Sequence, residues 1–256
     1  MKKNIIDLKN VAKYYEMGEN IVKALDGVNI NIEKGSFVAI MGPSGSGKST
    51  AMNLVGNLDI QTKGKIFLDN QETSKLTESH LAQIRGKKIG FIFQSFNLIP
   101  NLTVKENVML PMMFQGIDSE EREDIAEELL EKVELINRID HYPTQISGGE
   151  MQRVAIARAL ANNPEVILAD EPTGNLDTKT GENVIKFLKK LNNEGKTVIM
   201  VTHEPELAEA YADVVYWLRD GKIEKVSKHK NRFKIVKQER KFIKKNINRK
   251  IKESKK

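Results

Sequence analysis

The 256-residue chain contains no cysteine, which excludes disulfide bonds and cysteine-ligated metal sites and fits a reducing compartment. Long hydrophobic runs are also absent: the longest, such as VIMV at 198–201, are the length of a strand, so we expect no segment to span a bilayer. The first residues, MKKNIIDLKN, hold too short an apolar stretch for the core of a signal peptide. Any work at a membrane therefore requires a partner that provides the membrane-spanning part.

The positive charge of the chain is confined to its C-terminal end. The formal charge is +6, yet residues 222–256 hold 16 Lys and Arg against 3 Glu, whereas the first 221 residues hold 25 basic and 32 acidic residues. We predict a folded region over 1–225 and a lysine-rich tail over 226–256.

The tail has two interpretations. On a helix, four apolar residues form a narrow stripe among lysines, which fits an anionic membrane surface. These residues are Val236, Ile243, Ile247 and Ile251. The alternative is a solvated tail without fixed structure, which Asn246 and Asn248 favour because asparagine is a poor helix former.

The apolar patterns predict two sheets and a helical region. Residues 5–36 and 65–71 alternate apolar and polar residues between turns, as in an antiparallel sheet. Four apolar segments contain β-branched residues and mostly precede helix patterns, which predicts a buried parallel core. These segments are SFVAIMG, KIGFIFQ, EVILADE and KTVIMVTH. Residues 119–140 have helical spacing with Ser119 as the expected N-cap. We expect an α/β fold with a mainly parallel core sheet, an N-terminal antiparallel β subdomain and an α-helical subdomain inserted at about 97–150.

The segment GPSGSGKST at 42–50 follows a predicted strand and opens a predicted helix, which is the context that the phosphate-binding pattern GxxxxGK[ST] requires. In this pattern the glycines let the backbone curl around the phosphates, Lys48 reaches the β and γ oxygens, and the Ser49 hydroxyl binds Mg²⁺. The residues expected to bind the nucleoside triphosphate are Gly42, Pro43, Ser44, Gly45, Ser46, Gly47, Lys48, Ser49 and Thr50.

Polar residues stand where the apolar strands end. Asp170 and Glu171 follow VILA, so Asp170 is expected to hold Mg²⁺ and Glu171 to orient or deprotonate water. Gln94 ends KIGFIFQ and His203 ends KTVIMVTH, and both can point into the rim where open α/β sheets bind ligands. An ordinary surface position is the alternative for each of these two. Together, Ser49, Gln94 and Asp170 are the expected Mg²⁺ ligands.

A second anion site is predicted at ISGGEMQRVAIARAL, residues 146–160. Ser147, Gly148 and Gly149 precede a helix, where free N–H groups and the helix dipole favour a phosphate. One nucleotide already occupies the first loop, so this terminus has no phosphate in its own chain. We expect it to cap the γ-phosphate held by a second copy, in a two-fold pair with two ATP molecules. Arg153 and Arg158 are expected nearby; a flexible helix entry is the alternative.

These motifs resemble the ATP-binding cassette (ABC) family of transporter ATPases, over about residues 1–225. They are the loop 42–50, Gln94, SGGE at 147–150, Asp170 and Glu171, GNLD at 174–177, and His203. The resemblance implies an ATPase whose dimer closes on two ATP and reopens after hydrolysis, driving an integral membrane permease docked in a groove near Gln94. It makes Glu171 the catalytic base, His203 a γ-phosphate switch residue, and Asp177 a contact across the dimer.

The resemblance extends to the adenine and to the signature. An aromatic residue ahead of the phosphate loop usually stacks on adenine, and we favour Tyr15 over Tyr14 because Tyr15 lies just before the Met-Gly turn. The signature departs from the common leucine-to-glutamine version in having Ile146 and Glu150. Glu150 adds a negative charge beside the phosphate-facing glycines, which bears on dimer closure.

Within the family, residues 23–69, 89–111 and 153–182 resemble the subgroup that includes the ATPases of macrolide and antimicrobial-peptide exporters, of lipoprotein-release systems, and FtsE. The resemblance implies ATP and Mg²⁺ as cofactors and a cytoplasmic location, peripheral on the cytoplasmic face of the cell membrane. Two alternatives are a guanylate-type nucleotide kinase, which has no use for SGG, and an ABC-type ATPase acting on nucleic acid or the ribosome. The latter relatives carry a coiled-coil insertion or a second cassette, which this chain lacks, so we expect no nucleic-acid partner.

Overall fold

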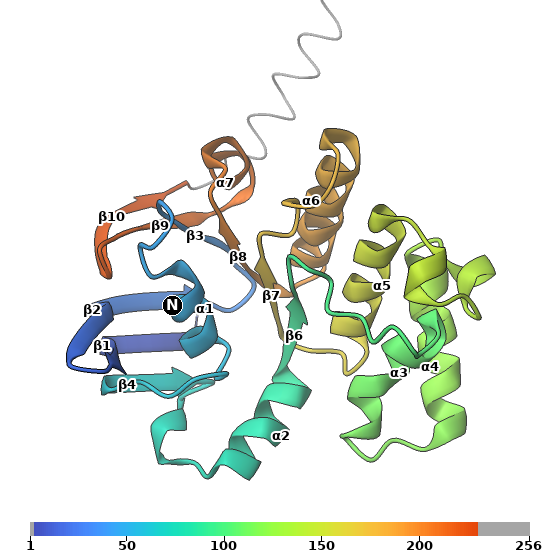
Figure 1. The fold of residues 1–256 in the computed structure, drawn as a ribbon, viewed down its shortest axis with the longest axis horizontal. Coiled ribbons are helices and arrows are strands. Elements are labelled where there is room, and N and C mark those ends of the chain that lie inside the picture. The colour runs from blue at the N-terminus through green and yellow to red at the C-terminus, as the bar shows by residue number, and fades with distance from the viewer. Residues whose placement is uncertain (1–2, 230–256) are drawn as a thin grey trace, which may run out of the picture.

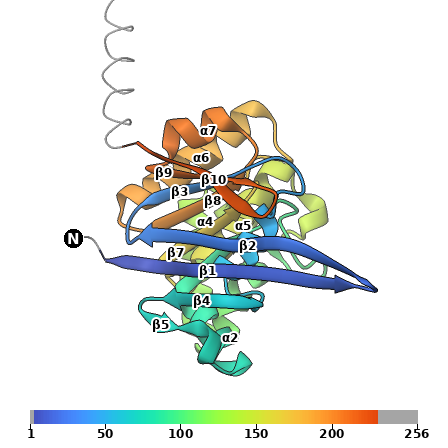
Figure 2. The same ribbon diagram turned by 90° about the vertical axis from the view of Figure 1, so that its left-hand side faces the viewer.

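Two sheets and a set of helices build the fold, which the computed structural model describes over residues 3–229 (Figure 1). The first sheet is antiparallel and has the strand order β2-β1-β4-β5. Its strands are β1 (Asn4–Met17), β2 (Asn20–Glu33), β4 (Lys63–Leu68) and β5 (Gln71–Glu72). Figure 2 shows that the long β1–β2 hairpin projects beyond the rest of the molecule. The predicted antiparallel β subdomain is confirmed.

The second sheet has six strands in the order β10-β9-β3-β8-β7-β6. They are β3 (Phe37–Met41), β6 (Ile89–Ile92), β7 (Val166–Asp170), β8 (Thr197–Thr202), β9 (Val214–Arg219) and β10 (Lys222–Lys228). All neighbours pair in parallel except β9 and β10, which form an antiparallel edge. This confirms the mainly parallel core, and β10 continues past residue 225, where the sequence predicts the start of the tail.

Seven helices lie among the described residues, together with three short 3-10 turns. The helices are α1 (Lys48–Val55), α2 (Glu78–Lys88), α3 (Val104–Met113), α4 (Ser119–Lys132), α5 (Gly148–Leu160), α6 (Thr178–Asn193) and α7 (Pro205–Tyr211). Figure 1 shows α3, α4 and α5 packed together beside the β6 edge of the core sheet, which is the predicted helical subdomain. Within residues 3–229, no helix combines the length and the apolarity that a bilayer crossing needs.

The helix predicted over 119–140 is shorter, and its N-cap is different. Asp118 has the extended backbone of an N-cap, and Ser119 is the first helical residue. The helix ends at Lys132 because Glu134 turns into the left-handed region at φ 61°. The N–H of Glu134 bonds to Glu131 and that of Leu135 to Leu130, which is a Schellman ending. Glycine usually occupies the left-handed position of such an ending. Because Glu134 occupies it here, the sequence gives no signal for the end of the helix, and the predicted helix is too long.

The core sheet separates two hydrophobic cores, because successive side chains of a strand point to opposite faces. On β3, Phe37 and Ala39 face the core that contains α3, α4, α5 and α6. Val38 and Ile40 face the core formed with α1 and the antiparallel sheet. Helices α1 and α5 therefore pack on opposite faces of one sheet, which fixes the positions of the two predicted phosphate sites.

Candidate active site

The parallel strands bring the predicted catalytic residues to one edge of the core sheet. Strands β3, β6, β7 and β8 run in the same direction, so their carboxyl ends meet at that edge. The loop 42–50 follows β3, Gln94 follows β6, Asp170 ends β7, and His203 follows β8. Four segments that are far apart in the sequence therefore supply one site.

Glycine is required in the phosphate loop for steric reasons. A β-carbon at Gly42 would lie 2.2 Å from the carbonyl oxygen of Leu218, and one at Gly47 would lie 2.3 Å from that of Ala24. At Gly45 a β-carbon would meet nothing within 4 Å, and its φ of +75° favours glycine. The loop is therefore packed against the protein at two positions and open at the third, as a cradle for an anion requires.

The start of α1 offers the donors that a phosphate needs. Its N-cap, Gly47, provides no side-chain acceptor, and the first turn contains no acidic residue, so its N–H groups have no side-chain partner there. Lys48 Nζ donates to the carbonyl oxygen of Pro43 at 2.9 Å, at the mouth of the same loop. This arrangement fits the triphosphate of a nucleotide.

Asp170 and Glu171 lie together at the end of β7. Burial raises the pKa of Asp170, the charge of Glu171 raises it further, and Lys48 opposes both effects. Glu171 has a φ of 42°, so the chain leaves the strand geometry at this residue while its N–H still bonds to Val201 at 2.9 Å. The carboxylate of Glu171 contacts His203, with 3.2 Å between Oε1 and Nδ1. The predicted base and the predicted switch residue are therefore neighbours.

Gln94 is tied to the segment that follows Glu171. Asn175 Nδ2 donates to the carbonyl oxygen of Gln94 at 2.8 Å. Gly174 lies against the Gln94 side chain, because a β-carbon at Gly174 would lie 2.7 Å from Gln94 Nε2. Ser49, Gln94 and Asp170 offer hydroxyl, amide and carboxylate oxygens, which suit Mg²⁺. Within the described ranges no three His, Cys, Asp or Glu side chains form a metal cluster.

Tyr15 lies beside the phosphate loop helix, whereas Tyr14 points elsewhere. The Tyr15 hydroxyl donates to Asp59 Oδ2 at 2.8 Å, and burial followed by this carboxylate raises the pKa of Tyr15, while Thr50 of α1 lowers it. The Tyr14 hydroxyl donates to Asp26 at 2.7 Å. Stacking of Tyr15 on adenine stays a prediction, and its position beside Thr50 is consistent with it.

The serine-glycine terminus lies on the other face of the sheet. Ser147 is the N-cap of α5, and its hydroxyl bonds to Glu150 at 2.7 Å, not to any residue of the phosphate loop. The prediction that Arg158 lies near this terminus is wrong. Arg158 is in the last turn of α5, where its guanidinium donates to the carbonyl oxygens of Phe96 and Asn97. The error comes from sequence proximity, because ten helical residues extend about 15 Å.

Asp177 has a structural task in this chain. It is the N-cap of α6, and its carboxylate accepts the N–H groups of Lys179 and Thr180, both at 3.1 Å. The hydrogen bonds from Thr180 and Lys179 lower the pKa of Asp177. Its predicted contact across a dimer stays a prediction.

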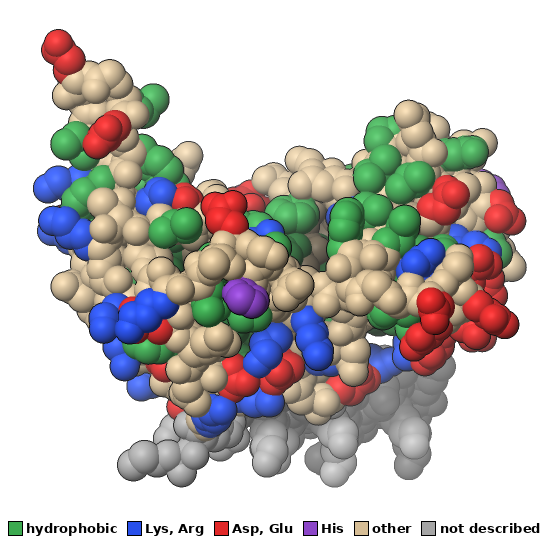
Figure 3. All heavy atoms as spheres, turned by 90° about the horizontal axis from the view of Figure 1, so that it is seen from below, with side chains coloured by type: hydrophobic (Ala, Val, Ile, Leu, Met, Phe, Trp, Pro, Cys, Tyr) green, Lys and Arg blue, Asp and Glu red, His purple; other side chains and the backbone are tan. Residues whose placement is uncertain are grey.

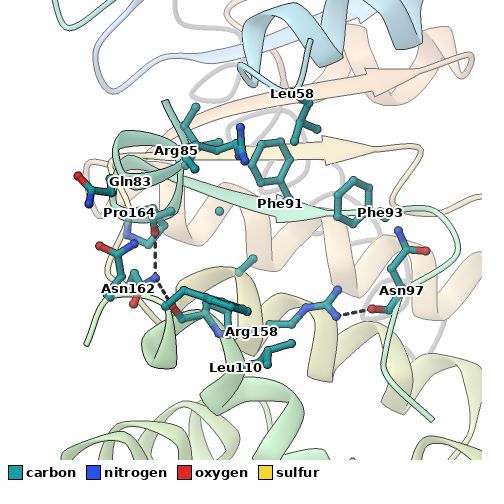
Figure 4. A pocket seen from close by; sticks show the side chains of 18 of the residues that line it. Leu58, Gln83, Arg85, Phe91, Phe93, Asn97, Leu110, Arg158, Asn162 and Pro164 are labelled. Atoms are coloured by element: carbon teal, nitrogen blue, oxygen red, sulfur yellow. Dashed lines mark hydrogen bonds between the residues drawn. The ribbon is translucent and has the colours of Figure 1, made fainter. Parts of the chain in front are cut away.

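Two features near the site have no motif in the sequence. Arg138 pairs with Glu150, with 3.3 Å between Nε and Oε1, although twelve residues separate them. A cavity of about 590 Å³ lies between α2, β6 and the ends of α3 and α5 (Figure 4). Its lining includes Leu58, Arg85, Phe91, Phe93, Phe114 and Arg158. Figure 3, a view from below, shows this face hollowed between two lobes with hydrophobic side chains on the walls.

Comparison with known proteins gives consistent matches over this region. The model of the ABC transporter family matches residues 25–174. An uncharacterized ABC transporter ATP-binding protein of Methanocaldococcus jannaschii, MJ0796, is 54% identical over 229 residues, which cover 88% of this chain and 97% of that protein. YknY of Bacillus subtilis is 49% identical over 219 residues, covering 86% and 95% respectively. The macrolide export ATP-binding/permease protein MacB of Mannheimia succiniciproducens is 50% identical over 220 residues, which are 86% of this chain but 34% of that longer protein.

Solved structures agree with the sequence matches. A dimeric structure of MJ0796 in a post-hydrolysis state, bound to ADP and Pi, has a TM-score of 0.81 at 52% identity and covers 87% of this chain and 98% of that one. A second dimeric structure of MJ0796 has the same TM-score at 54% identity, with the same coverage.

Proposed function

Because this chain belongs to the ABC transporter family, it is an ATP-binding and ATP-hydrolysing subunit of such a transporter, and we propose that it works as a pair of copies sharing two ATP molecules. One observation carries the proposal: α1, with the phosphate loop, and α5, with Ser147, pack on opposite faces of one sheet. A rigid core of this kind keeps the two anion sites of one chain apart. A second copy in two-fold orientation can supply the missing half of each site.

The relatives support this arrangement. The MJ0796 structures are dimeric, and one of them holds ADP and Pi, the products of ATP hydrolysis. In the proposed pair, the loop 42–50 of one copy binds the triphosphate, and Ser147 and the glycines after it in the partner copy face the γ-phosphate. Tyr15 stacks on the adenine, and Asp177 lies close to the partner copy.

The reaction is an attack of water on the γ-phosphate. Glu171 accepts the proton of the attacking water, and His203, in contact with it, keeps the carboxylate oriented and senses the γ-phosphate. Lys48 stabilises the negative charge on the transferred phosphoryl group. Ser49, Gln94 and Asp170 would hold Mg²⁺, which when bound neutralises charge on the phosphate oxygens.

The partner in the membrane is a permease of the export type, by analogy with the macrolide exporter whose ATP-binding part this chain resembles. The cavity of about 590 Å³ suits its docking, because exposed aromatic and aliphatic side chains line it beside the loop of Gln94. Arg158 joins the two: it lines the cavity and bonds to the carbonyls of Phe96 and Asn97 in that loop. The protein then works on the cytoplasmic face of the cell membrane.

A mixing experiment tests the shared site. Lys48→Ala removes the charge that binds phosphate but leaves Ser147 intact. Ser147→Arg leaves the phosphate loop intact but fills the space of the partner's γ-phosphate. Each variant alone should hydrolyse ATP at below about 1% of the wild-type rate. A mixture should regain activity, since a mixed pair contains one site with both halves intact. If the mixture stayed as inactive as its components, the proposed pair would be wrong.

A further inference from the structure

Two helices of this protein begin with the same capping box. At α3, the N–H of Thr103 donates to Glu106 Oε2 at 2.7 Å, and the N–H of Glu106 donates to the Thr103 hydroxyl at 3.2 Å. At α5, Ser147 and Glu150 make the same two bonds, at 2.8 and 3.3 Å. The α5 box has a further bond: the Ser147 hydroxyl donates to Glu150 Oε2 at 2.7 Å.

Glu150 is also held from its other side. Arg138 Nε lies 3.3 Å from Glu150 Oε1, so one carboxylate receives the N–H and O–H of Ser147 and a guanidinium. The Ser147 hydroxyl and N–H, followed by Arg138, lower the pKa of Glu150, although burial opposes them. Glu150 is therefore ionised at neutral pH and forms a charge-assisted bond with Ser147.

The bond matters because of the task that the proposed function gives to Ser147. A serine hydroxyl has a single hydrogen to donate, so it cannot serve Glu150 and a phosphate oxygen at the same time. The carboxylate and the phosphate are both negative and both favoured at the positive end of α5. They compete for one donor and repel each other.

We propose that Glu150 is a positioning residue that restrains the Ser147 hydroxyl in the separate chain, so that closure of the pair transfers this hydroxyl from Glu150 to a γ-phosphate oxygen of the partner's ATP. The inference rests on the proposed function. Arg138 neutralises part of the charge of Glu150 and so favours closure. The pair thus closes only when the bound triphosphate outcompetes a carboxylate of the chain itself.

The test compares two Glu→Gln changes in capping boxes, each in a Glu171→Gln background that accumulates the closed pair. Dimerisation is measured by sedimentation equilibrium in MgATP. Glu150→Gln keeps the acceptor for the Ser147 N–H but removes the charge, so the dissociation constant of the pair should fall roughly three- to tenfold, since each pair contains two such sites. Glu106→Gln, the matched control at α3, should leave it unchanged. Glu150→Gln should lower the melting temperature at least as much as Glu106→Gln, because Glu150 also pairs with Arg138.

Charge effects separate this role from a structural one. The advantage of Glu150→Gln should shrink at high salt, because Glu150 is partly exposed. Arg138→Gln should weaken the pair when Glu150 is present and have no effect in the Glu150→Gln chain. An unchanged or raised dissociation constant in Glu150→Gln would overturn the inference. A Glu171→Gln chain that forms no ATP-dependent pair would instead overturn the proposed function, and the inference with it.

Discussion

His203 Nδ1 lies 3.2 Å from Glu171 Oε1, so the ends of the neighbouring strands β8 and β7 bring an imidazole and a carboxylate into contact. The Glu171 side chain is 22% exposed and that of His203 is 62% exposed. The carboxylate is thus partly shielded, while the imidazole remains accessible to a ligand. A change at either residue is therefore expected to affect the other.

We expect Glu171→Gln to bind MgATP within about threefold of the wild type and to hydrolyse it at least 100-fold more slowly. The amide keeps the shape and the contact with His203 but cannot accept a proton. Phosphate release and nucleotide binding measure the two effects separately. Glu206→Gln, at an exposed position in the first turn of α7, is the control and should turn over normally. Normal turnover of Glu171→Gln would show that another group is the base.

Asn107 supports residues 99–103, the segment that follows Gln94 and leads into α3. It is fully buried, its Oδ1 accepts the N–H of Ile99 at 2.8 Å, and its Nδ2 donates to the carbonyls of Ile99, Leu102 and Thr103. Asn107→Ala leaves buried carbonyls without donors, so the free energy of unfolding should fall by about 2–4 kcal/mol. Urea unfolding measures it.

Asn137→Ala is the control for Asn107→Ala. Because Asn137 is exposed, this change should alter the free energy of unfolding by less than about 0.5 kcal/mol. A similarly small effect of Asn107→Ala would contradict a supporting role.

Phe114 is 79% exposed and lines the cavity proposed for the permease. Phe114→Asp places a charge on this apolar wall, so the protein should lose its permease when purified from detergent-solubilised membranes, while ATP hydrolysis by the isolated protein persists. Ile136→Asp changes another exposed apolar residue, outside the cavity lining, and should retain the permease. Mass spectrometry of the co-purified proteins distinguishes the outcomes. Equal recovery with both variants would assign the docking site elsewhere.

The ion pairs of Asp69 should make the free energy of unfolding depend on pH in the acid range. Lys3 and then Lys88 hold the pKa of Asp69 at about 2, below its ordinary value of 3.8. A lowered pKa contributes stability above pH 3.8 that is lost as the pH falls towards 2. Asp69→Asn should therefore lower the free energy of unfolding by up to about 1 kcal/mol at pH 5 and by progressively less below pH 4. Urea unfolding across this range checks it; a constant difference would contradict the ion pairs.

The lysine-rich tail stays a prediction from the sequence, because its apolar stripe lies outside the described residues 3–229. Strand β10 ends at Lys228, and the N–H of His229 bonds to Asp213 at 2.7 Å, so a cut after Lys230 leaves the core sheet whole. The shortened protein should keep its ATPase activity and lose salt-sensitive sedimentation with anionic liposomes. Equal liposome binding by both forms would exclude a membrane role for the tail.

The meeting of the proposed catalytic residues at one edge of the core sheet was predictable, because the strand patterns in the sequence match the observed parallel strands. The strand patterns give parallel neighbours, and polar residues at their carboxyl ends must then meet, which brings Gln94, Asp170 and His203 to one site. Helix α2 has no such signal: it buries no residue, so it has no apolar stripe to detect. The pairing of Arg138 with Glu150 depends on how the 3-10 turn Ile136–Arg138 lies against α5, which is a tertiary contact without a sequence motif.

The left-handed backbone of Glu171, at φ 42°, sets folding and chemistry against each other at one position. Residues with a β-carbon adopt this region at a cost of about 1 kcal/mol, and glycine adopts it freely. Glycine at position 171 would therefore suit the backbone and remove the carboxylate proposed as the base. A screen that ranks variants of this protein by melting temperature alone would select against the proposed base.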